Sequence, residues 1–358
     1  MRSYLDHNAT STLRPEAKAA MVAAMDCTGN ASSVHGEGRA ARKMLDDARA
    51  QVARAVGVIA PMVVFTSGGS EANNMVLKGA PVERIIVSAV EHPSVLEAAR
   101  ASGKPVETIP VDGNGVIDLD QLETMLKGPR ALVSVMLANN ETGVVQPLAD
   151  VVRLAQGHLV HSDAVQVLGK LPLNLAMLPL DFMTLSAHKN GGAVGVGAVV
   201  IRDGIVVDPL LHGGGQELRR RAGTENLVTI ASFGAVAGLK QDVRQLRDRL
   251  EAELDGAVIF GSGVERLPNT TCFAYPGMKA ETLLMAFDLE GVAVSSGSAC
   301  SSGKVAKSHV LAAMGVKPEI SEAAIRVSLG WDTSEQDIEH FTAAWRKIRD
   351  RHKARAAA

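Results

Sequence analysis

The chain has 358 residues, of which 46% are hydrophobic, so it is long enough for about two domains and can bury a sizeable core. The 37 basic and 39 acidic residues leave a formal net charge of −2, which excludes a general attraction to nucleic acid or to an anionic membrane surface. Three scattered cysteines exclude a disulfide framework and a Cys/His zinc site, and no apolar run reaches the roughly 20 residues of a membrane span. We therefore predict a soluble protein of a reducing cytoplasm, with neither nucleic acid nor membrane as a partner.

In chain order, the first two thirds of the sequence alternate between helical and strand-like segments. Helices are expected at 15–25 and 39–56, where apolar residues recur at helical spacing. Apolar runs that predict strands follow at 63–65, 84–88, 131–137, 158–161 and 182–185. Near-continuous apolar strands that alternate with helices predict a mostly parallel sheet with both faces covered.

The pattern changes after residue 210. A Gly- and Arg-rich stretch covers 211–226, and one helix is predicted at about 227–254. Beyond it, β-like runs alternate with helical segments, at 257–260, 270–274, 279–290, 292–294, 309–314 and 334–351. We therefore predict a large domain of residues 13–240 and a small α+β domain of residues 1–12 and 241–358.

Lys189 lies at the polar end of the strand predicted at 182–185. Ser186 and His188 flank it, and a glycine-rich turn at 191–197 follows. An amine beside a hydroxyl and an imidazole is a candidate for forming a Schiff base with a carbonyl cofactor. The alternative is an ordinary surface lysine in a loop.

Other strands also end in polar residues at the sheet edge where ligands of such folds bind. Asp163 follows the strand at 158–161 and precedes Gln166 by three residues; it is either a partner for the protonated ring nitrogen of pyridoxal phosphate or the N-cap of the next helix. His92 suits stacking on a flat ring or proton transfer, and Asn140 ends a further strand. Taken alone, either of these two would be an ordinary turn residue.

The segment 66–71, Thr-Ser-Gly-Gly-Ser-Glu, joins a strand to a helix. Small residues there let backbone N–H groups approach an anion at the helix N-terminus, although the segment is neither a Walker P-loop nor a GxGxxG fingerprint. The alternative is a plain glycine-rich turn. Together, a phosphate cradle, an acid, a planar stacker and a lysine at one sheet edge predict a pyridoxal phosphate site.

Cys300 lies within a Ser- and Gly-rich run, 294–304. This setting predicts an exposed, mobile and reactive thiol. Cys27 and Cys272 fall in helix-like and strand-like windows and are predicted to be structural.

A series of motifs resembles those of pyridoxal-phosphate-dependent cysteine desulfurases of the class V aminotransferase superfamily, most of all the nitrogen-fixation and iron–sulfur-assembly type. The motifs run in the family's order along nearly the whole chain: YLDHNATS, NASSVHGEGR, FTSGGSEANN, EHPSV, NNETGVVQP, HSDAVQVLGK, SAHK, GGGQELRRRAGTEN, SSGSACSSG and IRVSLG. The resemblance implies the fold of type I pyridoxal phosphate enzymes, a mostly parallel seven-stranded sheet flanked by helices, with a smaller α+β domain.

The resemblance also implies three catalytic residues. Lys189 would bond the cofactor as a Schiff base and move protons on the substrate. His92 would stack on the cofactor ring and act in acid–base steps. Cys300 would attack the sulfur of bound L-cysteine, leaving alanine and a persulfide that passes to a scaffold protein for iron–sulfur clusters. No resident metal is implied, with Cys300 at most a transient cluster ligand.

Binding roles follow in the same way. Asp163 would pair with the pyridinium nitrogen and Gln166 would hydrogen-bond the ring hydroxyl. Asn140 and Arg326 would hold the substrate carboxylate, a task that suits the planar fork of an arginine. The cofactor-binding set as a whole is Gly69, Ser70, His92, Asn140, Asp163, Gln166, Ser186, His188 and Lys189, joined across a homodimer by Thr224 of the partner subunit.

Two positions depart from the family pattern. The turn after Lys189 has Ala193 and Val194 where the family usually has a Pro-Lys pair, and the early loop has Ala31 where the family usually has proline. The segment 301–308 is about as long as in the subgroup that hands sulfur directly to scaffold proteins. Two alternatives stay open: a selenocysteine lyase or another class V lyase or transaminase, and a non-catalytic scaffold on the same fold.

Overall fold

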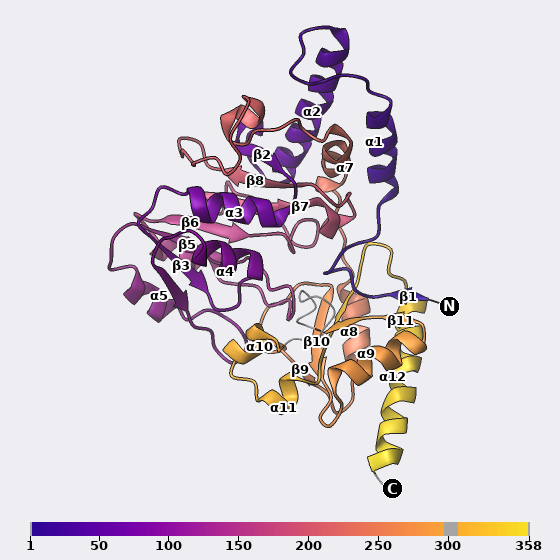
Figure 1. The fold of residues 1–358 in the computed structure, drawn as a ribbon. Coiled ribbons are helices and arrows are strands. Elements are labelled where there is room, and N and C mark those ends of the chain that lie inside the picture. The colour runs from indigo at the N-terminus through magenta and orange to yellow at the C-terminus, as the bar shows by residue number, and fades with distance from the viewer. Residues whose placement is uncertain (1, 297–306, 357–358) are drawn as a thin grey trace.

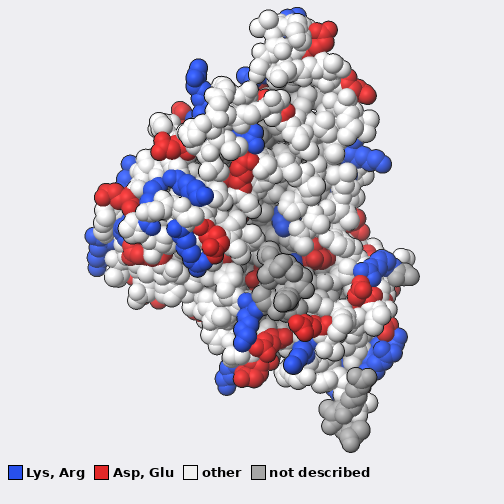
Figure 2. Space-filling view, viewed as in Figure 1, with Lys and Arg blue, Asp and Glu red and all other residues white. Residues whose placement is uncertain are grey.

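A computed structural model describes residues 2–296 and 307–356 of the chain, with side chains through residue 354. Figure 1 shows two layered parts, a larger one built around the central sheet and a smaller one that holds both the N-terminus and the C-terminal helix. Charges of both signs are interspersed on the face shown in Figure 2, in agreement with the near-zero net charge.

The central sheet of the described chain has seven strands, as the sequence predicts. Their order is β2 (Val63–Thr66), β8 (Gly197–Ile201), β7 (Phe182–Ser186), β6 (Leu159–Asp163), β5 (Ala131–Ser134), β3 (Arg84–Ser88) and β4 (Val106–Ile109). Only β8 runs antiparallel to its neighbours, so the sheet is mostly parallel. All residues of these strands are buried except Val106, Glu107 and Thr108 of β4, which is why the other six sequences are near-continuous apolar runs.

Helices cover both faces of this sheet. Successive strand residues point to opposite faces, so each face contributes its own apolar side chains to a core. Phe65 and Met183 face a core shared with α1 (Pro15–Met25), α2 (Gly36–Ala55), α5 (Leu119–Met125), α6 (Leu148–Leu154) and α7 (Leu227–Ala237). Val64 and Phe182, one residue earlier in each case, face a second core formed with α3 (Gly69–Gly79) and α4 (Pro93–Arg100). The sheet therefore leaves only its strand ends and edges for a site.

The smaller part has its own sheet and its own core. The antiparallel strands β12 (Ser295–Ser296), β13 (Ala324–Ser328), β10 (Thr270–Ala274) and β9 (Val258–Ile259) pair in that order, and β1 (Ser3–Tyr4) pairs with β11 (Val292–Ala293). The helices are α8 (Arg244–Ala252), α9 (Ala280–Leu289), α10 (His309–Ala313), α11 (Pro318–Ser321) and α12 (Glu335–Ala356). We keep the predicted domain bounds as a proposal, which is supported by a core that joins Leu5 to residues 243–348.

One sequence prediction about secondary structure is wrong, and one strand was not predicted. The single helix predicted at about 227–254 is two helices, α7 and α8, because Gly238 caps the first and the backbone N–H of buried Gln241 bonds the carbonyl of Gly169 instead of continuing the helix. Strand β4 was not predicted, because this edge strand exposes Val106 and therefore has no continuous apolar run. The predicted helix at 15–25 is confirmed, with Pro15 at its first position.

Candidate active site

A cavity of about 340 Å³ opens where the strands β2, β3, β5, β6 and β7 end. Most of the residues predicted for the site line it together: Gly69, Ser70, His92, Asn140, Asp163, Gln166, Ser186, His188, Lys189 and Arg326. Sequence reasoning missed the remaining lining residues, which are Asn8, Ala9, Asn73, Ser94, Met136 and Val165. Five of these six, all but Met136, lie in motifs that carried the family resemblance, so the signal was present but pointed to no particular role.

Among the described residues, Thr224 is the one predicted site residue that does not line this cavity. Thr224 lines a separate cavity of about 210 Å³ together with Ser67 and Arg221. Cys300 lies outside the described residues. Of the other cysteines, Cys272 is fully buried and burial raises the pKa of its thiol, which supports a structural role, whereas Cys27 is partly exposed.

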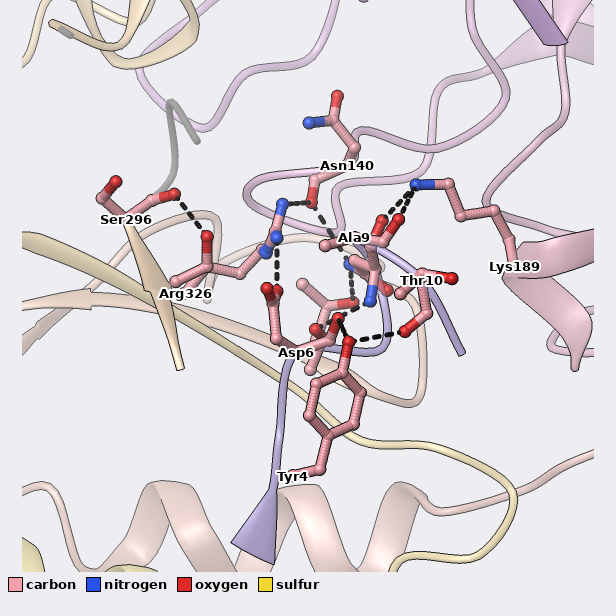
Figure 3. Close-up of polar contacts among 12 residues, drawn as sticks. Tyr4, Asp6, Ala9, Thr10, Asn140, Lys189, Ser296 and Arg326 are labelled. Atoms are coloured by element: carbon pink, nitrogen blue, oxygen red, sulfur yellow. Dashed lines mark hydrogen bonds and ion pairs between the residues drawn. The ribbon is translucent and has the colours of Figure 1, made fainter. Parts of the chain in front are cut away.

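Lys189 reaches the cavity from a short 3₁₀ turn, Ala187–Asn190, that follows β7. Its Nζ donates hydrogen bonds to the backbone carbonyls of Asn8 (2.6 Å) and Ala9 (2.7 Å), as Figure 3 shows. Both acceptors belong to the N-terminal segment, which crosses from the small part to the sheet edge. The lysine therefore lines a cavity instead of an open loop surface, and its role as a Schiff-base amine stays a prediction.

His188 lies beside Lys189 and is held by Thr10, whose Oγ1 is 3.1 Å from its Nδ1. Burial, and then the charges of Lys189 and Lys170, lower the pKa of His188 to about 4. The ring is thus neutral at neutral pH, and it can offer one N–H to an anion without adding a charge.

Asp163 ends β6 and is only 6% exposed. Its two carboxylate oxygens accept N–H bonds from the side chain of Asn73 (2.8 Å) and the backbone of Val165 (3.0 Å). A turn, not a helix, follows at 164–170, so the N-cap alternative is wrong. No cationic side chain among the described residues forms an ion pair with Asp163, and a buried carboxylate is costly until a cation joins it. This unmatched acid fits the protonated ring nitrogen of pyridoxal phosphate.

His92 is the N-cap residue of α4, and its Nδ1 accepts the backbone N–H of Ser94 (3.1 Å). The Ser94 hydroxyl lies 2.7 Å from the same nitrogen and accepts an N–H from Asn73, so it turns its own proton to His92. The amide of Asn73 has a forced orientation because the Asp163 carboxylate only accepts. The neutral ring of His92 therefore carries its proton on Nε2.

Burial lowers the pKa of His92, and the charges of Lys189 and His309 lower it further against the opposing effect of Asp163. A neutral imidazole at neutral pH suits stacking on a ring and hydrogen-bond donation from Nε2. The lowered pKa is not that of an imidazole that would be protonated in the resting enzyme at neutral pH.

The anion cradle predicted at 66–71 lies at the N-terminus of α3, whose N-cap position is Gly68 and carries no side-chain cap. Gly69 packs so closely that an added Cβ would approach Val165 Cγ2 to 2.9 Å. Backbone N–H groups at the first turn of a helix are left without helical acceptors and attract anions. With the hydroxyls of Ser70 and Ser186 in the same cavity, this end fits a phosphate group.

Arg326 reaches the cavity from β13 in the small part, and its side chain is 4% exposed. Its guanidinium donates to the carboxylate of Asp6 (2.6 Å) and to the backbone carbonyl of Asn140 (3.1 Å), and its Nε is buried without a partner among the described atoms. Figure 3 shows the Asp6–Arg326 pair next to the carbonyl of Asn140. The arginine is thus held in place from two sides, with donor capacity left for a carboxylate.

Two further carboxyl groups lie buried behind the cavity. Burial raises the pKa of Glu91 to about 8, although the Ser88 hydroxyl (2.7 Å) and the Met136 N–H (2.6 Å) both donate to it. Burial also raises the pKa of Glu141, which accepts a 2.5 Å hydrogen bond from the hydroxyl of Ser308. Neither group was among the site residues predicted from the sequence.

Comparison with known proteins agrees with this geometry. Residues 3–341 match the family described as aminotransferase class-V, and the chain belongs to that family. It is 42% identical to a cysteine desulfurase of Cereibacter sphaeroides, over 99% of this chain and 97% of the relative. It is 38% identical to the cysteine desulfurase IscS of Dictyoglomus turgidum, over 94% of this chain and 92% of the relative.

Comparison of the fold with solved structures also indicates similarity to proteins of this kind. The NifS-like protein of Rickettsia africae superimposes with a TM-score of 0.90 at 36% identity, over 98% of this chain and all of that chain. The predicted type I fold and the predicted cofactor, pyridoxal 5′-phosphate, are confirmed, and within its family the chain is an enzyme of the cysteine desulfurase type. No helix of the described chain is long and apolar enough to cross a bilayer.

Proposed function

We propose that this chain converts L-cysteine to L-alanine and passes the sulfur, as a persulfide on Cys300, to an acceptor protein for iron–sulfur cluster assembly in the cytoplasm. The observation that carries the proposal is the juxtaposition in one cavity of Lys189, the unmatched acid Asp163 and the small-part arginine Arg326. An amine, an acid and a carboxylate-binding cation are what an amino acid substrate and this cofactor require together.

The cofactor would be held at four places. Lys189 would attach it covalently, Asp163 would pair with its ring nitrogen, and Gln166 would donate to its ring hydroxyl oxygen. The first turn of α3, with Ser186 and His188, would bind its phosphate. When bound, the cofactor supplies an electron-withdrawing ring that stabilises negative charge at the substrate α-carbon.

The chain's own residues do the remaining work. Arg326, already oriented by Asp6, would bind the substrate carboxylate, and Lys189 Nζ would carry a proton to and from the substrate carbons. The thiolate of Cys300 would attack the substrate sulfur. A sulfur–sulfur bond forms, the carbon–sulfur bond breaks, and its electron pair stays on carbon, which takes a proton to become the methyl group of alanine.

The Cys300→Ala variant tests this proposal. We expect it to keep the visible absorbance of the bound cofactor and to lose alanine and sulfide production from L-cysteine. Unchanged turnover in this variant would refute the assigned nucleophile. Alanine release from selenocysteine that does not need Cys300 would favour a selenocysteine lyase, and a protein that stays colourless with added cofactor would favour a scaffold.

We also propose a homodimer in which Thr224 completes the phosphate site of the other subunit. Support comes from the separate position of Thr224 and from the exposed apolar side chains Val34 (88% exposed) and Val194 (66% exposed). The second of these belongs to the turn that departs from the family pattern.

Mixed dimers test the shared site. Lys189→Ala and Thr224→Ala homodimers are each expected to be impaired. A heterodimer of the two variants would contain one site with both residues intact, so mixing and refolding should restore activity. Failure of the mixture to exceed the sum of the two homodimers would place Thr224 outside the partner's site.

A further inference from the structure

Lys170 is a buried amine to which neither the motifs nor the proposed mechanism gives a role. It lies at the end of the turn after β6 and is 6% exposed. Its Nζ donates to two side-chain amide oxygens, Oε1 of Gln166 (3.1 Å) and Oδ1 of Asn8 (3.2 Å). Within the described part of the chain it forms no ion pair with a carboxylate. Burial, and then the charges of Lys189 and Arg326, lower its pKa to about 7.

Burying an amine without a carboxylate partner destabilises the folded state. We therefore looked for a functional role of its hydrogen bonds in the active site. Both acceptors line the active-site cavity. The lysine itself does not line it, which means that Lys170 acts on the cavity through these two amides.

The first amide belongs to Gln166. Because a lysine side chain serves as the donor in this contact, Oε1 of Gln166 faces Lys170 and Nε2 faces the other way. One proton of Nε2 bonds the backbone carbonyl of Asn8 (3.0 Å). The second proton is left for the cavity. Gln166 is thus presented as a donor, the polarity that a ring hydroxyl oxygen requires.

The second amide belongs to Asn8 and is fixed in the same way. Its Oδ1 accepts from Lys170 and from Asn269 (3.1 Å), and its Nδ2 donates to the carbonyl of Asn140 (3.2 Å). The backbone carbonyl of this same Asn8 accepts from both Gln166 and Lys189 (2.6 Å). One residue therefore connects Lys170 to the amine that would attach the cofactor.

We propose that Lys170 is a positioning residue that fixes the donor side of the Gln166 amide toward the cofactor ring and the Asn8 carbonyl toward Lys189. The inference rests on the proposed function, in which Gln166 donates to the ring hydroxyl oxygen. Without Lys170, only the bond from Nε2 to the Asn8 carbonyl still holds the Gln166 amide, which can then rotate more easily and present Oε1, an acceptor, to the ring oxygen. The two oxygens would then repel each other.

A double-mutant cycle on the purified holoenzyme tests this role. The variants are Lys170→Met, which keeps the length of the side chain but removes the donor, Gln166→Ala, and the two combined. The readouts are the dissociation constant of pyridoxal 5′-phosphate and the visible absorption spectrum at fixed pH. We expect each single variant to weaken cofactor binding by roughly tenfold, the size of one lost hydrogen bond to a charged group.

The combined variant separates positioning from mere packing. If Lys170 acts through Gln166, the double variant binds the cofactor no more weakly than Gln166→Ala alone. Effects that multiply would overturn the action through Gln166, and a Lys170→Met variant with wild-type affinity and spectrum would overturn the whole inference. A Gln166→Ala variant that binds and absorbs like the wild type would instead overturn the proposed role of Gln166.

Two further variants complete the test. Lys104→Met is the matched control, because Lys104 also donates only to carbonyl oxygens, those of Lys78 (3.2 Å) and Ala80 (2.7 Å), far from the cavity in the structure. We expect it to leave affinity and spectrum unchanged.

Lys170→Arg keeps a side chain that donates hydrogen bonds, and it is used instead of Lys170→Met if Lys170→Met does not fold. A folded Lys170→Arg should stay within about threefold of wild-type affinity, and a tenfold loss would contradict the role of the hydrogen bond.

Discussion

The two walls of the active-site cavity are built differently. The large-domain wall consists largely of residues at the ends of buried strands or within a few residues after them, among them His92, Asp163 and Lys189. The opposite wall consists of the N-terminal segment, with Asn8 and Ala9, and of Arg326. Neighbouring strand ends of the first wall are brought together by the sheet alone, whereas the second wall needs chain segments more than 300 residues apart.

Their electrostatics differ as well. On the large-domain wall, burial keeps His92 and His188 neutral, and no described cation pairs with Asp163. On the opposite wall, Arg326 is already paired with Asp6 at 2.6 Å. The first wall thus has a carboxylate, Asp163, whose cationic partner would be supplied by the cofactor. The second wall holds the guanidinium of Arg326 in place for a substrate carboxylate. Variants on the two walls should therefore fail in different ways.

The largest effect is expected on the first wall, from Lys189→Ala. Removing the amine removes both the covalent attachment and the proton carrier, so activity should fall by at least about 10³-fold. The visible absorbance should disappear after gel filtration, while Lys104→Met keeps it. A band that survives gel filtration would show that the cofactor is attached elsewhere.

A smaller but still large loss is expected from Asp163→Asn on the same wall. The amide cannot neutralise a protonated ring nitrogen, so kcat should fall by roughly 10²–10³-fold, the usual cost of a lost electrostatic stabiliser. The protein should stay folded, because Asn73 can still bond the remaining oxygen. Steady-state kinetics beside the exposed control Asp150→Asn checks this, and a full retention of kcat would contradict the pairing.

Asp6→Asn on the second wall should act on substrate binding instead. Arg326 would lose its ion pair and part of its fixed orientation, so KM for L-cysteine should rise by about tenfold with little change in kcat. The control is Asp288→Asn, which breaks the exposed pair with Arg2 (2.6 Å) and should leave both constants unchanged. A fall in kcat without a change in KM would show that Asp6 acts in the chemical step. It would also contradict the proposed difference between the two walls.

The smallest effect is expected behind the first wall, at Glu91. Its pKa is raised from 4.5 to about 8, so the folded state binds the proton more tightly than the unfolded state does. This group therefore favours folding most below pH 4.5, and the free energy of unfolding should decrease as the pH rises from 4.5 toward 8. Glu91→Gln should flatten that decrease in urea titrations at several pH values. The exposed control Glu97→Gln should keep the wild-type slope.

The sequence was sufficient to predict most of the large domain. Six of its seven central strands are buried on both faces and therefore have near-continuous apolar sequences, and polar residues at their ends marked the site. The exposed edge strand β4 and the break between α7 and α8 escaped prediction. In both cases tertiary contacts, and not the local pattern, decide the conformation.

The second wall shows where sequence reasoning stops. YLDHNATS was recognised as a family motif, yet nothing in its pattern indicates that the carbonyls of Asn8 and Ala9 accept from Lys189. Lys170 likewise carries no local signal, since a lysine after a glycine turn is ordinarily exposed. Its partner Asn8 comes from the N-terminal segment, and only the tertiary structure shows that this segment passes beside Lys170.

The amino-acid sequence by itself therefore determined the class of enzyme, the mostly parallel sheet and the polar residues at the strand ends, because these depend on local patterns and short motifs. Only the tertiary structure decided the orientation of Gln166, the Asp6–Arg326 pair and the neutral state of His92. These depend on burial and on hydrogen bonds between distant segments, whose energies arise when the folded chain removes the groups from water.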